Sequence, residues 1–70
     1  MTVSYEVFDA LLKKGGIKSY TVSKDTGVSQ AALSRWKSGS TQPSLETLST
    51  IARYFGVGVE AFLVEENSHD

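Results

Sequence analysis

The feature that constrains this chain most is the stretch from Ser19 to Ser38, in which two short amphipathic segments meet at Gly27. Two helices that cross steeply through a short turn need a small side chain where their backbones approach. They also need a residue tolerant of positive φ in the turn and apolar residues along the shared seam. Ser23 and Gly27 meet the first two needs. The stretch therefore predicts a helix, a tight turn and a second helix, with a seam of Val22, Val28, Leu33 and Trp36.

The second helix of this pair has its predicted start at Ser29. A serine at this place accepts a hydrogen bond from the backbone of the first turn, and Val28 and Leu33 are spaced around it as a hydrophobic staple. The helix is expected to run from about Gln30 to Ser38. Its outer face then carries side chains with no obvious partner within the chain: Gln30, Ala31, Ser34, Arg35 and Lys37.

Capping signals and helical spacing predict three more short helices. Ser4 caps a first helix that ends at Gly15-Gly16, and the helix before Gly27 begins after either Lys18 or Ser19. The apolar face of the first helix consists of Tyr5, Phe8, Leu11 and Leu12.

A polar loop follows the third helix, and Pro43-Ser44 then predicts the start of a fourth, because proline cannot lie inside a helix and serine caps it. Gly56 ends this helix, and Gly58 caps a short fifth one. The predicted apolar faces are Leu45, Leu48, Ile51, Ala52 and Phe55 in the fourth helix, and Phe62 and Leu63 in the fifth.

The stretch from Ser19 to Ser38 resembles the DNA-binding helix-turn-helix of the lambda-repressor-like, or Xre, family of bacterial and phage regulators. Ser38-Gly39, Pro43-Ser44-Leu45 and Phe55-Gly56-Val57 match later landmarks of that family in order and spacing, so the resemblance covers nearly the whole chain. It implies an all-α fold, a compact bundle of five short helices in which the second and third form the helix-turn-helix.

The formal net charge of −1 does not by itself indicate a nucleic-acid partner, but its distribution is uneven. Between Lys13 and Lys37 Asp25 is the one acidic residue, and between Thr26 and Leu45 there is none, whereas acidic residues crowd the C-terminus. A polyanion would meet a locally positive face, as phosphate contact requires. The alternative is an ordinary scatter of charge.

Seventy residues make one small domain, which we place at residues 1–64, followed by a solvated tail at residues 65–70. The absence of cysteine excludes disulfides and thiolate metal sites and is compatible with a cytoplasmic location. No apolar run approaches the roughly 20 residues needed to cross a bilayer. A single histidine, His69, and no recognisable catalytic constellation predict neither a metal, a cofactor nor an enzyme.

The resemblance implies that the third helix reads base edges in the major groove. Gln30 suits a bidentate contact with adenine, and Arg35 matches the two acceptors of guanine, although each has a plainer reading as a surface polar residue. Ala31 can touch a thymine methyl, and Ser34 can bond a base or a phosphate. The predicted base-reading residues are therefore Gln30, Ala31, Ser34 and Arg35.

Contacts to the DNA backbone are implied at the starts of both helices of the pair and in the loop after the third. The family usually has glutamine where Ser19 stands and asparagine where Ser38 stands, so this chain departs from it at both places. The predicted backbone contacts are Ser19, Tyr20, Ser29, Lys37, Ser38, Ser40, Thr41 and Gln42.

The implied function is sequence-specific binding of double-stranded DNA by a transcriptional regulator, most often a repressor in this family. Because one helix reads too few base pairs, a homodimer on half-sites about 34–36 Å apart is expected. By resemblance, its contacts lie near Gly56, Val57, Gly58 and Val59. Two alternatives stay open: the antitoxin of a toxin–antitoxin pair, and a protein-interaction module that keeps the fold without reading DNA.

Overall fold

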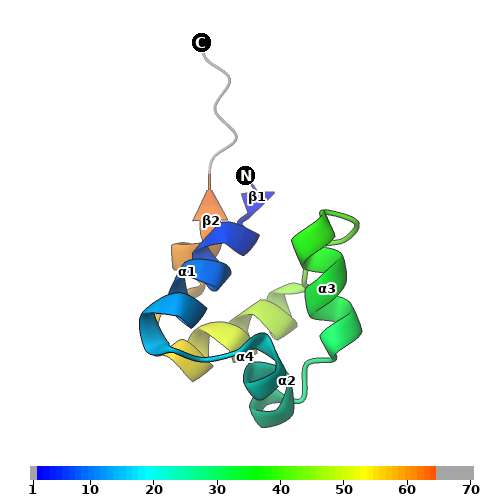
Figure 1. Ribbon diagram of the computed structural model, residues 1–70. Coiled ribbons are helices and arrows are strands. Elements are labelled where there is room, and N and C mark those ends of the chain that lie inside the picture. Colours follow the sequence, from blue (N-terminus) through cyan, green and yellow to red (C-terminus); the bar gives the residue numbers. More distant parts are fainter. Residues whose placement is uncertain (1, 65–70) are drawn as a thin grey trace.

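Helix boundaries in the computed structural model, which describes residues 2–64, follow the capping residues (Figure 1). Three serines each accept a hydrogen bond from the backbone N–H three residues later, and the helix before Gly27 begins at Ser19, with Lys18 at its N-cap. Serines favour this place because they satisfy an otherwise unpaired N–H group. The helices are α1 (Tyr5–Gly15), α2 (Ser19–Thr26), α3 (Gln30–Ser38) and α4 (Leu45–Phe55), and the capping serines are Ser4, Ser29 and Ser44.

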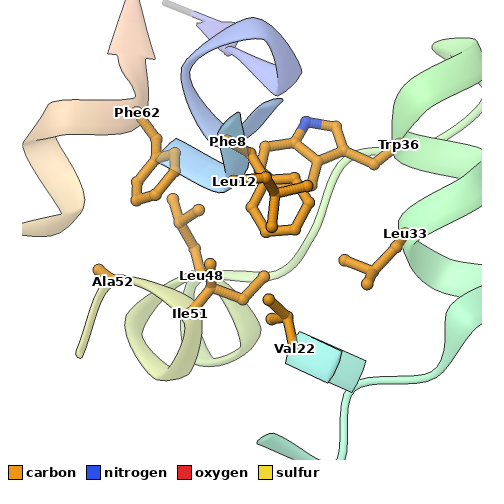
Figure 2. Close-up of a cluster of buried hydrophobic side chains, with 9 residues drawn as sticks. All are labelled: Phe8, Leu12, Val22, Leu33, Trp36, Leu48, Ile51, Ala52 and Phe62. Carbon is orange, nitrogen blue, oxygen red and sulfur yellow. The ribbon is translucent and has the colours of Figure 1, made fainter. Parts of the chain in front are cut away.

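One apolar cluster lies between the four helices (Figure 2). Trp36 extends from α3 into its centre, where it packs against Phe8 of α1, with ring centroids 5.2 Å apart. This confirms the prediction that Trp36 belongs to the core, together with Val22 and Leu33 of the predicted seam. The buried cluster consists of Phe8, Leu12, Val22, Leu33, Trp36, Leu48, Ile51, Ala52 and Phe62.

Leu45 is the one member of the predicted apolar face of α4 that is neither buried in this cluster nor packed against it, whereas Phe55 is partly buried and packs against the cluster. Its side chain is 71% exposed. Helical spacing places it in line with Leu48, but as the first residue of α4 it lies beyond the edge of the core, next to the loop that leads from α3. The prediction of a buried Leu45 is therefore wrong.

The predicted fifth helix is a single 3₁₀ turn, η1 (Val59–Phe62), so the domain has four α-helices among its described residues. The amide of Ala61 bonds the carbonyl of Gly58 at 3.0 Å, the short spacing of a 3₁₀ turn. The chain then becomes extended at Leu63, which was expected on the helix. Four residues between Gly58 and the extended segment are too few for a stable α-helix.

The extended segment forms a small antiparallel pair that the sequence did not predict. Strand β1 (Thr2–Val3) pairs with β2 (Leu63–Val64), with Val3 opposite Leu63. Both ends of the described chain thus lie side by side (Figure 1). The predicted tail, residues 65–70, lies outside the described residues, so the division at residue 64 stays a prediction.

Candidate nucleic-acid interface

The turn between α2 and α3 is fixed by backbone conformation and by two hydroxyl groups. Gly27 has a φ of 81°, which only glycine adopts without strain. The Thr26 hydroxyl donates to the carbonyl of Val22 at 2.7 Å and accepts from the amide of Val28 at 3.2 Å, while the Ser23 hydroxyl donates to the carbonyl of Val28. Sequence reasoning named Ser23 only as a small residue and missed Thr26. Both hydroxyls hold the two helices at a defined angle.

Helix α3 has one buried side and one exposed side. Leu33 and Trp36 lie in the core, and the hydroxyl of Ser29 caps the helix by accepting from the amide of Ala32 at 3.0 Å. The four residues predicted to read bases, Gln30, Ala31, Ser34 and Arg35, are all exposed on the opposite side.

The loop after α3 begins with a second left-handed glycine, Gly39, whose φ is 84°. The carbonyl of Arg35 accepts from the amide of Ser40 at 2.9 Å and from the Ser38 hydroxyl at 3.0 Å. The hydroxyls of Ser38 and Ser40 also lie 2.9 Å apart. These bonds hold the loop against the end of α3, so that its exposed side chains, Ser40, Thr41 and Gln42, continue from the exposed side of the helix.

A hollow of about 220 Å³ lies beside the exposed side of α3. It brings Ser19, at the start of α2, close to Gln30, Ser34 and Lys37, which the sequence alone could not place together. Helix α2 is the one α-helix of the described chain without a side-chain cap, so its first N–H groups favour an anion there. The lining residues are Tyr5, Ser19, Gln30, Leu33, Ser34 and Lys37.

Tyr5 was not among the predicted site residues, although it forms one wall of this hollow. Its ring packs edge-on against Trp36, with centroids 5.3 Å apart. Burial raises the pKa of its phenol above the ordinary value of 10.0, and the nearby Asp9 adds to the effect. A phenol is protonated at neutral pH even at the ordinary pKa, so Tyr5 lines the hollow as an uncharged side chain.

The charges on this side of the molecule are not neutralised within the described part of the chain. Across residues 2–64 the one ion pair joins Lys13 and Asp9 on α1, at 3.0 Å, so neither Arg35 nor Lys37 is paired there. Asp25, the acidic residue nearest the turn, instead accepts a hydrogen bond of 2.8 Å from the hydroxyl of Tyr54. Within residues 2–64, the exposed side of α3 therefore carries positive charge that no ion pair neutralises.

The remaining predicted backbone contacts surround α3. Tyr20, on the first turn of α2, is 62% exposed, and Ser29, Lys37 and Ser38 are also exposed. Ser19 is half-buried at the edge of the hollow. The structure thus places all twelve predicted site residues on α2, α3 or the segments beside α3, in positions that solvent reaches.

Other kinds of site find little support among residues 2–64. No group of three His, Cys, Asp or Glu side chains in that range is placed to hold a metal ion. Nor does that part of the chain contain a helix long and apolar enough to span a membrane.

Comparison with protein families gives one match, to a model described as helix-turn-helix, over residues 9–62. The matched region includes α2, α3, α4 and most of α1. Comparison with curated proteins and with solved structures gives no significant match. Because the matched region covers well over half of the chain, this protein belongs to the lambda-repressor-like, or Xre, helix-turn-helix family of DNA-binding regulators.

Proposed function

We propose that this chain binds a specific double-stranded DNA site as a transcriptional regulator, with α3 in the major groove. The observation that carries the proposal is the two-sided character of α3. Its apolar side is held in the core by Leu33 and Trp36, and its polar side, with Arg35 and Lys37 unpaired among the described residues, is open to a partner.

The dimensions of α3 suit that groove. An α-helix with its side chains is about 10–12 Å across, and the major groove of B-DNA is about 12 Å wide. Nine residues of α3 rise about 13 Å, enough to bring base-reading side chains over a few adjacent base pairs. Gln30 lies at the N-terminal end of the helix and Arg35 a little over one turn further along.

Within this arrangement the site residues have two roles. Gln30, Ala31, Ser34 and Arg35 face base edges and provide specificity. Contacts to phosphates fix the register of the protein on the duplex. The hollow between Ser19 and Lys37 faces the same DNA. It combines the uncapped N-terminus of α2 with the amine of Lys37. The residues proposed for the backbone are Ser19, Tyr20, Ser29, Lys37, Ser38, Ser40, Thr41 and Gln42.

A repressor role, a cytoplasmic location and a homodimer on the operator are parts of the same proposal. One α3 reads too few base pairs for a genome, so two copies on adjacent half-sites are needed. The segment assigned to the dimer contact, residues 56–59, follows α4 and exposes both of its glycines, while Val57 and Val59 are half-buried. The available apolar surface there is small, so the dimer is expected to form mainly on DNA.

A protein-interaction module that reads no DNA is the second candidate function. It is favoured by the net charge of −1 and by the loop after α3, where the hydroxyls of Ser38 and Ser40 bond each other and no lysine is present. An antitoxin would combine both activities by binding an operator and a toxin. Co-purification with a small toxic protein encoded beside it would favour the antitoxin.

The testing experiment is a selection of bound duplexes from a random pool, followed by gel shifts of the enriched duplex at two salt concentrations. Arg35→Ala and Gln30→Ala are each expected to weaken specific binding by about 1–3 kcal/mol and to relax the base preference at one position. Lys37→Ala is expected to weaken binding evenly and to reduce the salt slope by about 1.

The matched control is Arg53→Ala, which removes the same charge from the last turn of α4. The loop from α3 enters α4 at the N-terminal end of that helix, which lies about 13 Å from Arg53 along the helix axis. This variant should bind like the natural chain. A failure to enrich any sequence, or equal losses for the Arg53 and Arg35 variants, would contradict sequence-specific reading by α3.

A further inference from the structure

The two ends of the described chain form a small structure that lies mostly outside the matched region. We call residues 2–4 and 62–64 the terminal clasp. Val3 lies opposite Leu63 in the strand pair, and the amide of Ser4 donates to the carbonyl of Phe62 at 2.8 Å. The family match spans residues 9–62, so the N-terminal half of the terminal clasp lies outside the matched residues.

Helix α3 is bonded directly to the terminal clasp. The indole N–H of Trp36 donates to the carbonyl oxygen of Val3 at 3.1 Å, across 33 positions of sequence. Trp36 is 4% exposed and packs against the rings of Tyr5 and Phe8, and its bond to the half-buried Val3 is itself partly buried. Figure 2 shows the indole nitrogen on the side of the ring that faces the N-terminal chain.

This bond joins the C-terminal half of α3 to the terminal clasp. The backbone of α3 runs close to that of α2, which holds its N-terminal half through the turn at Gly27. Trp36 anchors the C-terminal half, which carries Arg35 and leads into the loop after Gly39. A change in the position of the indole would therefore tilt the end of α3 that carries Arg35.

We propose that the terminal clasp sets the orientation of α3 for DNA, with Trp36 as a positioning residue and the Val3 carbonyl as its anchor. The proposal rests on the DNA-binding function proposed above. A buried N–H without an acceptor is costly, so the tilt of α3 that reaches the Val3 carbonyl is favoured over other tilts. Without the anchor, α3 populates several tilts, and the apparent affinity falls in proportion to the competent fraction.

The anchor is a backbone carbonyl, so chemical synthesis tests it better than a side-chain substitution does. Three chains are compared: the full chain, a chain that begins at Ser4 with a free amine, and a chain that begins at Ser4 with an acetyl group. The acetyl carbonyl stands where the Val3 carbonyl stood, so the acetylated chain lacks the strand but keeps the acceptor. Each truncated chain is also made with Trp36→Phe, which removes the N–H donor and keeps an aromatic ring.

Affinity for the duplex selected with the full chain is measured at a temperature where every chain is folded by circular dichroism. The free-amine chain should bind about five- to tenfold more weakly than the full chain, the fold-change that corresponds to one hydrogen bond of typical strength. The acetylated chain should recover most of that loss. In the Trp36→Phe background the acetyl group should recover much less affinity. The acetyl group also removes the terminal charge in both backgrounds, so the effect of that charge cancels when the two recoveries are compared.

Two further measurements separate positioning from stability. Ile51→Val in the full chain trims the buried core and leaves the terminal clasp intact, so it should lower the melting temperature without changing the affinity. Trp36 is the one tryptophan of the chain, so its indole N–H gives a single proton resonance. That proton should exchange with water more slowly in the full and acetylated chains than in the free-amine chain.

Equal affinity of the free-amine and full chains would overturn the inference, as would a recovery by acetylation that persists in full in the Trp36→Phe background. Rapid exchange of the indole proton in the full chain would also overturn it, with or without DNA. A full chain that selects no duplex would instead overturn the proposed function and the inference with it.

Discussion

Removal of the cap of α3 by Ser29→Ala is expected to cost about 1 kcal/mol of folding free energy. The Ser29 hydroxyl accepts from the amide of Ala32 at 3.0 Å. An alanine at that third helical position offers no side chain that could bond back to the cap, so the serine acts alone. Serine-to-alanine changes at caps cost about 0.5–2 kcal/mol, and an exposed cap, where water replaces part of the bond, lies near the middle of that range.

The loss is large for a domain of this size. Small domains are stable by about 0.05–0.15 kcal/mol per residue, or roughly 4–10 kcal/mol for this chain, so the substitution removes a tenth to a quarter of the total. A loss of 1 kcal/mol should lower the melting temperature by about 4–8 °C, measured by circular dichroism. Ser29→Asp should melt near the natural chain, because aspartate also caps and its charge suits the helix dipole.

The matched control is Ser34→Ala, the same substitution five residues later, inside α3. The Ser34 side chain is exposed, and alanine is the better helix former, so stability should stay unchanged or rise slightly. The capping account is refuted if Ser29→Ala melts within about 1 °C of the natural chain, or if Ser34→Ala loses as much as Ser29→Ala.

Three further predictions concern the turn before α3, the buried cluster behind it and the hydrogen bond between α2 and α4. Gly27→Ala should cost about 1–2 kcal/mol in urea unfolding through its φ of 81° alone, since the space beside Gly27 is empty, and Gly27→Asn should cost less. Leu48→Ala, in the buried cluster, should cost about 2–5 kcal/mol, and a loss below that of Ser29→Ala would contradict the packing described. The hydrogen bond to Asp25 raises the pKa of Tyr54 above 10.0, so the folded chain holds the phenol proton more tightly than the unfolded chain. The stability from this bond is therefore complete below about pH 10 and is lost as pH rises through the raised pKa. Tyr54→Phe should reduce the loss of folding free energy at alkaline pH but leave the part due to Tyr5, whose pKa is also raised. An unchanged dependence of folding free energy on pH would contradict this assignment.

Local chemistry explains why most helix boundaries could be predicted from the sequence. Ser29 and Ser44 cap helices because their hydroxyls reach the backbone of the first turn, and that interaction depends only on neighbouring residues. The sequence places the start of α2 after either Lys18 or Ser19, because Lys18 lacks a capping side chain and no local bond marks the boundary. The two-sided character of α3 follows from spacing alone, and its exposed residues could be named in advance.

Contacts between distant parts of the chain could not be predicted in this way. The bond from Trp36 to Val3 and the strand pair at Leu63 depend on where the chain ends meet in space. No local sequence pattern marks either contact. The short apolar segment after Gly58 has helical spacing, but the pairing with β1 extends it instead. The hollow beside Tyr5 is likewise a product of packing between α1, α2 and α3.

DNA reading by α3 is tested most directly by a nuclear magnetic resonance titration of the ¹⁵N-labelled chain with the selected duplex. We expect the largest amide shifts on residues 29–42 and on Ser19 and Tyr20, while the outer face of α1 and residues 59–62 change little. Shifts confined to residues 56–62, or none across α3, would contradict the claim that the exposed side of α3 is the surface that reads DNA.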